Sequence, residues 1–243
     1  MGLTYFFSDV HLGTRQLKSE RLKEKRLLAF LDQVATSGER LFIVGDLFDF
    51  WFEYRTVIPR GYTRVLSALG QLRELGKEIH YIAGNHDFWM RDFLKSELNI
   101  EVHFDPLDCM IGQKRFYIHH GDGIARHDKG YRFLKRIFRN RFNIFLYSLI
   151  HPDLGIPLAK WVSNLSRHHT AGGTPDDRDY RETALQKFRE GFDCAIFGHL
   201  HYPVIQNYGE KVYINLGDWI EHFTYAVFNG EEIQLLTWGT GRR

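Results

Sequence analysis

Short apolar runs alternate with helical periods in the first third of the chain. LTYFFS at 3–8 reads as a buried strand, and RLFIVG at 40–45 and EIHYIAG at 78–84 read as two more. Between them, residues 19–36 and 60–75 carry apolar side chains at helical spacing among charges, which predicts two surface helices. This β-α-β-α-β order favours parallel strands with helices packed on the sheet.

The second part of the chain has a different pattern. Short apolar runs at 107–111 and 114–119 predict strands that pair antiparallel, and residues 124–190 are mainly helical in pattern. Strand patterns then return in CAIFG, PVIQNYG, KVYINLG, TYAVFNG and EIQLLTW. We therefore expect one sheet-forming core, residues 1–123 and 191–243, interrupted by a helical insertion at 124–190.

Composition narrows the possible classes of protein. A chain of 243 residues can bury a substantial core, and a net charge of +2 gives no global electrostatic case for nucleic acid as a partner. Two cysteines, Cys109 and Cys194, are too few for a disulfide framework. With no signal peptide in the pattern, they predict a reducing, cytoplasmic environment. The most apolar stretch, residues 142–150, is too short to span a bilayer.

Five of the predicted strands end in a cluster of Asp, Asn or His. In open α/β sheets, ligands bind beyond the carboxyl ends of the strands, so clusters remote in sequence can converge on one pocket. The clusters are Asp9 and His11 in SDVH, Asp46 and Asp49 in GDLFD, Asn85, His86 and Asp87 in GNHD, His119, His120 and Asp122 in HHGD, and His199 and His201 in GHLH.

Imidazoles and carboxylates that converge in this way are ligands for Mn²⁺, Fe or Zn²⁺. The clusters offer more donors than one ion takes, whereas two ions ~3.5–4 Å apart, bridged by one carboxylate, would use them. Asp46 lies inside an apolar run, where an unpaired charge is costly, so we expect metal to neutralise it. The glycines before Asp46, Asn85 and His199 would let the backbone turn sharply off each strand.

Each cluster also has an ordinary structural interpretation. GDLFD alone is commonly a capped turn, and one histidine among thirteen means little. Asp49 and Asp87 are expected to cap helices or hold loops around the ligands rather than to touch metal. What favours a metal site is the order of all five clusters, each at the end of a strand.

The five clusters resemble, in order, the motif set of the calcineurin-like metallophosphoesterases, over residues 9–201. The resemblance implies an α/β fold of four layers, a β-sandwich flanked by helices, here with an inserted helical lid. It also implies a metal-dependent hydrolase with two divalent ions, for which we expect Mn²⁺, with Fe or Zn²⁺ as alternatives. By this resemblance Asp9, His11, Asp46 and His201 hold one ion, Asp46, Asn85, His120 and His199 hold the other, Asp46 bridges them, and His86 contacts the scissile phosphate and protonates the leaving group.

The insertion carries a basic amphipathic segment. Residues 126–142 hold seven cations at helical spacing, with apolar side chains between them, and the apolar run 143–150 follows. This pattern predicts a helix that binds a membrane surface. A core-packing helix with a solvated basic face and a nucleic-acid patch are the two alternatives.

Within the family, the chain resembles the bacterial UDP-2,3-diacylglucosamine hydrolases of lipid A synthesis, on GDLFDFW, on HGDG with the helix after it, and on the lid. That implies cleavage of a lipid-linked nucleotide sugar to UMP and 2,3-diacylglucosamine 1-phosphate, by an enzyme peripheral on the cytoplasmic face of the inner membrane. It implies no obligate protein partner. Many members have Arg where this chain has His86. The expected substrate contacts are Asn85, His86, Asp122, Tyr131, Asn164, Ser166, Arg167 and His199.

Two alternatives to that function stay open on the residues alone. One is a phosphoesterase of the same chemistry that acts on a nucleotide, a phosphoprotein or another phosphodiester. The other is a non-enzymatic scaffold that uses the fold with a degraded site. Intact ligands at all seven positions argue against the scaffold, and the basic and apolar insertion favours the lipid-linked substrate.

Overall fold

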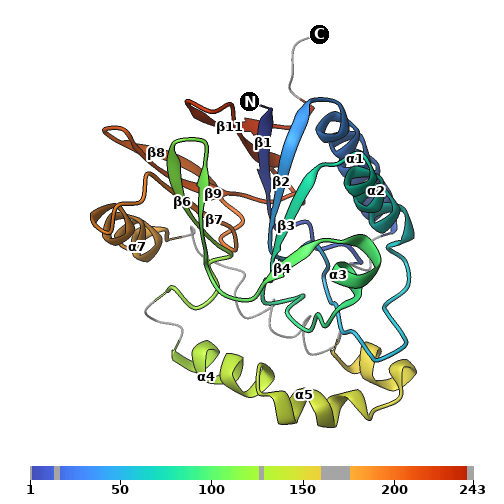
Figure 1. Cartoon of the computed structure of the whole chain (residues 1–243). Helices are drawn as coiled ribbons and strands as arrows, with labels where there is room; N and C mark the ends of the chain where they lie inside the picture. Colours follow the sequence, from blue (N-terminus) through green and yellow to red (C-terminus); the bar gives the residue numbers. More distant parts are fainter. Residues whose placement is uncertain (1, 14–16, 126–128, 160–175, 240–243) are drawn as a thin grey trace.

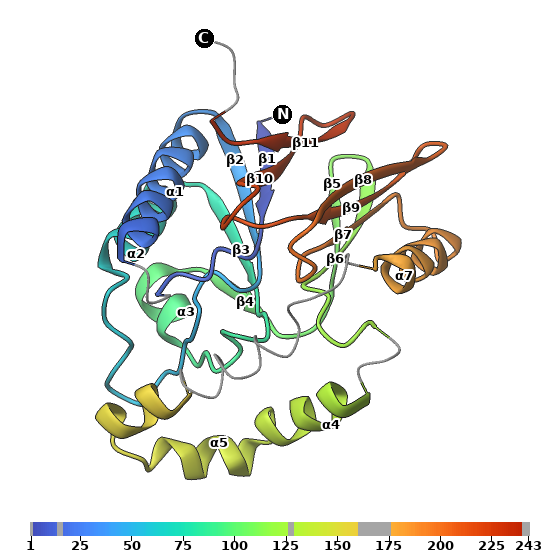
Figure 2. The ribbon, with the colours of Figure 1, turned by 180° about the vertical axis from the view of Figure 1, so that it is seen from behind.

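The computed structural model describes residues 2–13, 17–125, 129–159 and 176–239. Two β-sheets face each other, and helices cover their outer faces (Figure 1). Figure 2 shows the same layers from behind, with α1 and α2 on one side and α7 on the other. The α/β fold of four layers that the sequence predicts is confirmed.

The first sheet has the strand order β11-β10-β1-β2-β3-β4, with β1 to β4 parallel. Tyr5 and Phe7 of β1 pack with the helices outside this sheet, while Phe6 between them enters the layer between the sheets. The elements are β1 (Leu3–Phe7), α1 (Leu17–Ser37), β2 (Gly38–Val44), α2 (Thr63–Glu74), β3 (Glu78–Ile82), α3 (Phe93–Leu98), β4 (Glu101–His103), β10 (Thr224–Phe228) and β11 (Ile233–Thr237).

The second sheet has the order β5-β6-β7-β9-β8. Helix α7 (Arg178–Arg189) lies in the predicted insertion, yet Tyr180 and Phe188 pack against Phe197 and Tyr213 on the outer face of this sheet. It therefore forms the fourth layer. The strands are β5 (Leu107–Ile111), β6 (Lys114–His119), β7 (Cys194–Phe197), β8 (Pro203–Tyr208) and β9 (Lys211–Leu216).

The helices of the insertion before α7 lie apart from both sheets, beyond the end where β1, β2 and β3 finish (Figure 1). They are α4 (Lys129–Phe138), α5 (Arg141–Ser148) and a further helical segment at 152–159, together called the lid helices below. None of the helices in the described part of the chain is long and apolar enough to cross a membrane.

The aromatic run after Asp46 connects the core to the lid helices. Phe48 and Trp51 are buried in the core under α1 and α2. Phe50 and Phe52 instead form a separate cluster with Tyr54, Ala159 and the partly buried side chains of Trp89, Ile144, Tyr147 and Ile156. One short run of sequence therefore supplies aromatic side chains to two different packing clusters.

Two elements were missing from the sequence-based prediction. Helix α3 has six residues and strand β4 has three, and neither carries a long apolar run. The predicted strands at 107–111 and 114–119 are confirmed, and their antiparallel pairing with them.

Candidate metal centre

The loops after the strands hold most of the predicted ligands in an unusual backbone conformation. Asp9, His11 and Asp46 have φ of 54°, 48° and 53°, and His199 and His201 have φ of 70° and 55°. Residues other than glycine avoid this left-handed region, and backbone strain of this kind concentrates at functional sites. Five of the seven such residues in the described part of the chain are predicted ligands.

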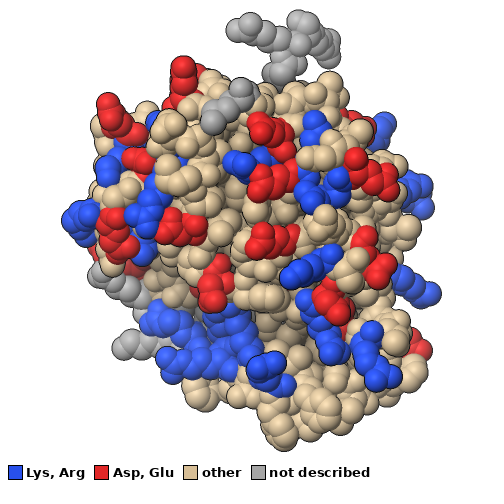
Figure 3. All heavy atoms as spheres, viewed as in Figure 1, with Lys and Arg blue, Asp and Glu red and all other residues tan. Residues whose placement is uncertain are grey.

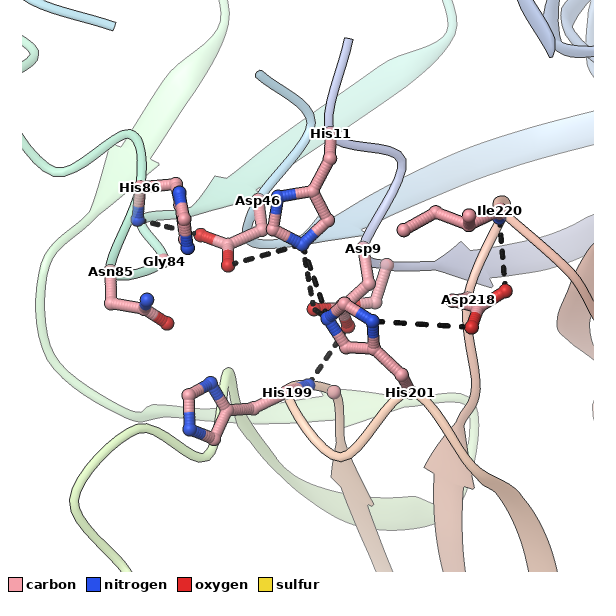
Figure 4. Close-up of polar contacts among 12 residues, drawn as sticks. Asp9, His11, Asp46, Gly84, Asn85, His86, His199, His201, Asp218 and Ile220 are labelled. Carbon is pink, nitrogen blue, oxygen red and sulfur yellow. Dashed lines mark hydrogen bonds and ion pairs between the residues drawn. The ribbon is translucent and has the colours of Figure 1, made fainter. Parts of the chain in front are cut away.

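Asp9, His11, His201 and Asp46 form the first group of converging side chains (Figure 4). The Nε2 atoms of His11 and His201 lie 3.2 Å apart. Oδ1 of Asp9 is 3.2 Å from Nε2 of His201 and 3.7 Å from Nε2 of His11. This oxygen is buried and accepts no hydrogen bond from the described residues. Nitrogen and oxygen lone pairs that face one another at these distances fit a bound cation.

The second group shares an atom with the first. Oδ2 of Asp46 is 3.6 Å from Nε2 of His11 and 3.4 Å from Nε2 of His120. The same His120 nitrogen is 3.0 Å from Oδ1 of Asn85. His199 completes this group, and its ring lies 5.2 Å from that of His120. Asp46 therefore lies between the two groups, in the position that a bridging carboxylate would take.

Burial and the neighbouring histidines shift the pKa of Asp46 in opposite directions. Burial raises the pKa of this carboxyl, but the fields of His120 and His86 and the hydrogen bond with His120 outweigh burial and bring the pKa well below its ordinary value. At His120 burial lowers the pKa, yet Asp46 and Asp9 bring it up to about 10. The pocket thus stabilises positive charge next to Asp46, which is the environment that a cation requires.

Three glycines make room for these side chains. Gly45 has a φ of 81°, and a Cβ there would overlap the ring of His120. A Cβ at Gly84 would overlap the Asp46 carboxylate, and one at Gly198 would overlap the Ser8 hydroxyl. The sequence suggested sharp turns at all three positions. At Gly84 and Gly198 the requirement is space, because their φ values are not in the positive region.

His86 lies beside the two groups and is fixed from two sides. Its backbone N–H donates to Oδ1 of Asp46 at 2.9 Å, and its Nδ1 donates to the carbonyl of Asp49 at 2.9 Å. Its ring stands almost perpendicular to that of His11, with the centroids 4.7 Å apart. His11, Asp46 and His86 also lie close enough together to bind a metal ion. Burial lowers the pKa of His86, while Asp46 opposes that shift.

Asp49 and Asp87 occupy supporting positions. Oδ1 of Asp49 lies 3.6 Å from Nδ1 of His11, on the side of the ring away from Asp46. Asp87 accepts a hydrogen bond from the N–H of Gly84 at 2.9 Å and another from the hydroxyl of Tyr81. Asp49 can therefore orient the His11 ring, and Asp87 holds the turn that carries Asn85 and His86.

The two adjacent histidines at the end of β6 point in different directions. Nδ1 of His120 donates to the carbonyl of Val44 at 2.9 Å, which ties it to the first sheet. The ring of His119 lies beside Tyr117, 6.3 Å between centroids. Ile118, which lies between Tyr117 and His119 in the sequence, enters the layer between the sheets. His119 belongs to none of the metal-binding groups found in the described part of the chain.

Asp218 is a functional candidate that the sequence-based interpretation missed. Its Oδ2 lies 4.0 Å from Nδ1 of His201, behind the ring (Figure 4). Its Oδ1 accepts from the backbone N–H groups of Ile220, Glu221 and His222 at 2.9, 2.8 and 3.0 Å. Asp218 follows Gly217 directly after β9, so the pattern of Gly-Asp at a strand end could have identified it.

Lys23 is a second missed residue. Its side chain is buried, and Nζ donates to the carbonyl of His11 at 2.7 Å and pairs with Glu20 at 2.7 Å. Glu20 in turn accepts from the N–H of Gly13 at 2.8 Å. The start of α1 therefore holds the loop that carries Asp9 and His11. A lysine in a helix gives no sequence signal for such a contact.

Some of the expected substrate contacts lie in the described part of the chain, and others lie outside it. Asp122 is buried and pairs with Lys135 at 2.6 Å and with Arg139 at 3.4 Å, so it connects the strand end of β6 to α4. Tyr131 belongs to α4, but its side chain is outside the described part. Asn164, Ser166 and Arg167 also lie outside the described residues.

Comparison with known proteins gives consistent matches. The family model for calcineurin-like phosphoesterases matches residues 3–203. The chain is 37% identical to UDP-2,3-diacylglucosamine hydrolase of Porphyromonas gingivalis, covering 95% of each chain, and 26% identical to that of Nitrosococcus oceani, covering 89% of this chain and 87% of the relative. A solved archaeal phosphodiesterase matches with a TM-score of 0.48 at 15% identity, over 96% of this chain and 98% of that one.

Proposed function

The chain belongs to the calcineurin-like phosphoesterase family and is a metal-dependent hydrolase, and from this premise we propose that it hydrolyses the pyrophosphate of UDP-2,3-diacylglucosamine. The products would be UMP and 2,3-diacylglucosamine 1-phosphate. The observation that carries this proposal is the 37% identity, over 95% of both chains, to a relative of that name. Other relatives with the same name match at lower identity, 26% and 27%.

Two divalent ions fit the two side-chain groups. Asp9, His11, Asp46 and His201 would hold one ion, and Asp46, Asn85, His120 and His199 would hold the other. The donors are imidazole nitrogens and carboxylate or amide oxygens without any thiolate, which suits Mn²⁺ as well as Fe or Zn²⁺, and we propose Mn²⁺. When bound, such ions neutralise phosphoryl oxygens and make a water molecule nucleophilic near neutral pH.

His86 is proposed as the proton donor to the leaving group. Its Nδ1 donates to the carbonyl of Asp49, so a proton passed to a phosphate oxygen would come from the other ring nitrogen, Nε2. Burial lowers the pKa of His86 while Asp46 opposes that shift, and a general acid works best when its pKa is near the working pH. The hydrogen bond from its backbone to Asp46 keeps the ring at a fixed place beside the metal groups.

The lid helices are proposed to bind the lipid part of the substrate. In the described part of the insertion, several large apolar side chains are exposed, which is unusual for a protein surface without a partner. The division into a core at 1–123 and 191–243 and a lid at 124–190 is part of this proposal, with α7 acting as a core layer. The exposed apolar residues are Phe133, Ile137, Phe142, Phe145, Leu146, Leu149, Leu154 and Leu158.

Basic side chains gather beside that apolar surface, over α4 (Figure 3). We propose that this segment, residues 126–142, approaches the anionic cytoplasmic face of the inner membrane. Two kinds of cation occur among its described side chains. Lys135 and Arg139 pair with Asp122, whereas Arg136 is exposed. Membrane attraction would therefore depend on Arg136 and its exposed neighbours more than on the whole basic run.

The experiment is hydrolysis by the purified protein with Mn²⁺ in detergent micelles. UDP-2,3-diacylglucosamine is compared with UDP-N-acetylglucosamine, for which UMP release is measured, and with bis(p-nitrophenyl) phosphate, for which p-nitrophenol release is measured. We expect the lipid-linked substrate to be cleaved with at least about tenfold higher kcat/KM, which corresponds to ~1.4 kcal/mol of extra transition-state binding. Equal rates on all three compounds would contradict the lipid-linked substrate while leaving the phosphoesterase chemistry intact.

A further inference from the structure

The outer edge of the first sheet carries a separate group of possible metal ligands. His80 on β3 and Glu101 and His103 on β4 offer ligand atoms that lie within 4.8 Å of one another. The parallel register pairs His80 with Glu101 and Ile82 with His103, so all four side chains project from the same face. Ile82 belongs to the apolar layer between the sheets, so the group lies at the open margin of that layer.

We infer that His80, Glu101 and His103 bind a Zn²⁺ ion at this edge. Nδ1 of His80 and Nε2 of His103 are 3.1 Å apart. Two Zn–N bonds of about 2.0–2.1 Å at a tetrahedral angle would separate the nitrogens by ~3.3–3.4 Å, so the rings need to move by only a few tenths of an ångström. An Oε2 atom of Glu101 lies 3.8 Å from the same His80 nitrogen and supplies the third ligand.

The neighbouring residues set the orientation of His80. Nε2 of His80 donates to Oε1 of Glu78 at 2.9 Å, because an ionised carboxylate can only accept. The lone pair of the neutral ring is then on Nδ1, which faces His103. Glu78 is itself held by Nε of Arg40 at 2.6 Å. A metal-binding histidine that donates its other N–H to a carboxylate is the usual arrangement in protein metal sites.

Packing also holds the His80 ring in place. It stacks on Phe42 with the ring centroids 4.8 Å apart and the planes at 13°. His103 is fixed through its backbone, whose carbonyl accepts from the N–H of Ala83 at 2.9 Å. The His80 ring and the backbone of His103 are therefore positioned before any ion binds, which reduces the entropy lost on binding.

An ion at this place would join β3 to β4. Strand β4 has three residues and is the edge strand of the first sheet, hydrogen-bonded as a strand to β3 alone among the described strands. A shared ligand set across the two strands would add a cross-link where the ladder is shortest. No residue of this group belongs to the metal groups around Asp46, so the inference is independent of the proposed substrate and reaction.

The test compares the number of zinc ions bound per chain in wild type and in variants of the edge group. Metal-free wild type and the His103→Gln and Glu101→Gln variants are saturated with Zn²⁺ and desalted, and zinc per chain is measured by inductively coupled plasma mass spectrometry. We expect each variant to retain one zinc ion fewer than wild type. Glu78→Gln should keep the full number but bind that ion ~10–100-fold more weakly in competition with a chelator, since it removes only the orienting carboxylate.

His151→Gln is the matched control. His151 is a surface histidine whose Nδ1 lies 3.7 Å from a carboxylate oxygen of Asp153, and it belongs to no group of possible ligands in the described residues. This variant should bind as much zinc as wild type. Mn²⁺-dependent cleavage of a soluble phosphodiester shows that each variant is folded. If His103→Gln and Glu101→Gln both hold the same zinc as wild type, the edge site does not exist.

Discussion

Two regions of this chain reverse the usual distribution of polar and apolar side chains. At the strand ends, Asp9, Asp46 and His120 are 0%, 1% and 0% exposed. On the lid helices, Phe142 and Leu149 are 65% and 67% exposed. Buried charge and exposed apolar surface each cost free energy unless something binds there. The first region fits cations, and the second is the surface that we propose for an apolar partner.

The two regions also differ in how firmly the chain holds them. The predicted ligand residues are held by strand ends, by left-handed backbone and by a network that includes Ser8, whose hydroxyl lies within hydrogen-bond distance of both the Asp9 carboxylate and the Val44 carbonyl. The described contacts of the lid helices with the core are one aromatic cluster, the pairs with Asp122 and a few hydrogen bonds, such as the one from Nε1 of Trp89 to the carbonyl of Phe138 at 3.0 Å. We infer that catalysis depends on the rigid region and substrate choice on the loosely attached one.

The strongest way to break this comparison is to remove the shared carboxylate. Asp46→Ala should lower turnover on every substrate by about 10³-fold or more, since charge neutralisation by metal is worth several kcal/mol and ~1.4 kcal/mol is tenfold in rate. It should also lower the metal content, because Oδ2 of Asp46 lies close to ligand atoms of both groups. Turnover and metal per chain are measured on the same sample.

Asp108→Ala is the control for Asp46→Ala. Asp108 is an exposed carboxylate that pairs with Arg115 at 2.6 Å on the far sheet, and an exposed pair contributes little to stability. This variant should keep both activity and metal. If Asp46→Ala keeps two ions and near-normal turnover, the metal centre does not depend on a bridging carboxylate.

A second substitution separates metal binding from proton transfer within the rigid region. His86→Ala should slow turnover by ~10²–10⁴-fold, the usual contribution of a general acid, and should leave the metal content unchanged. His119→Ala is the control. The His119 ring lies beside Tyr117 and not with the ring of His120, so this variant should also retain metal. Loss of metal in His86→Ala would instead make His86 a ligand, which its closeness to His11 and Asp46 allows geometrically.

Acidity should affect the two regions differently. Burial lowers the pKa of His11, but the carboxylates of Asp49, Asp9 and Asp46 raise it to about 9, and His120 is raised to about 10. The metal-free centre therefore holds protons at pH 7 that an incoming ion must displace. Metal affinity should fall as the pH falls, by about tenfold per pH unit for each displaced proton.

Calorimetry in buffers of different ionisation enthalpy counts those protons directly. We expect release of at least one proton per chain when Mn²⁺ binds at pH 7, and none when the lid binds detergent micelles. A metal-binding enthalpy that does not depend on the buffer would contradict the assignment of His11 and His120 as ligands.

Much of the rigid region could be predicted from the sequence, because each strand end carries its signal within a few residues. LTYFF at the start shows a strand buried on both faces, and GDLFD shows carboxylates inside apolar surroundings. Strand β4 could not be predicted, since three half-exposed residues have no pattern. Asp218 could have been found from its Gly-Asp pattern, whereas Lys23 could not, because its partner is a backbone carbonyl.

The lid shows the opposite limit of prediction. Its sequence revealed a basic amphipathic helix but not which cations face inward. Lys135 and Arg139 reach Asp122, a contact 13 to 17 residues away that depends on where α4 lies relative to β6. Arg132 donates to the carbonyl of Ala125 at 2.7 Å. Spacing defines a helical face, but it does not define the partner of that face.

The smallest expected effect separates an exposed cation of α4 from an inward-facing one that is its neighbour in the sequence. Arg136 is exposed, while Lys135 pairs with the buried Asp122 at 2.6 Å. If the lid approaches an anionic membrane, Arg136→Gln should weaken binding to phosphatidylglycerol vesicles by about fivefold, because one cation near such a surface contributes ~1 kcal/mol. Lys135→Gln should change vesicle binding less and instead lower the melting temperature, since it removes a charge partner from Asp122. Co-sedimentation at two salt concentrations and thermal unfolding measure the two effects. Equal vesicle binding by wild type and Arg136→Gln, independent of salt, would mean that the exposed basic face is only solvated and that the apolar residues alone carry the lid's affinity for lipid.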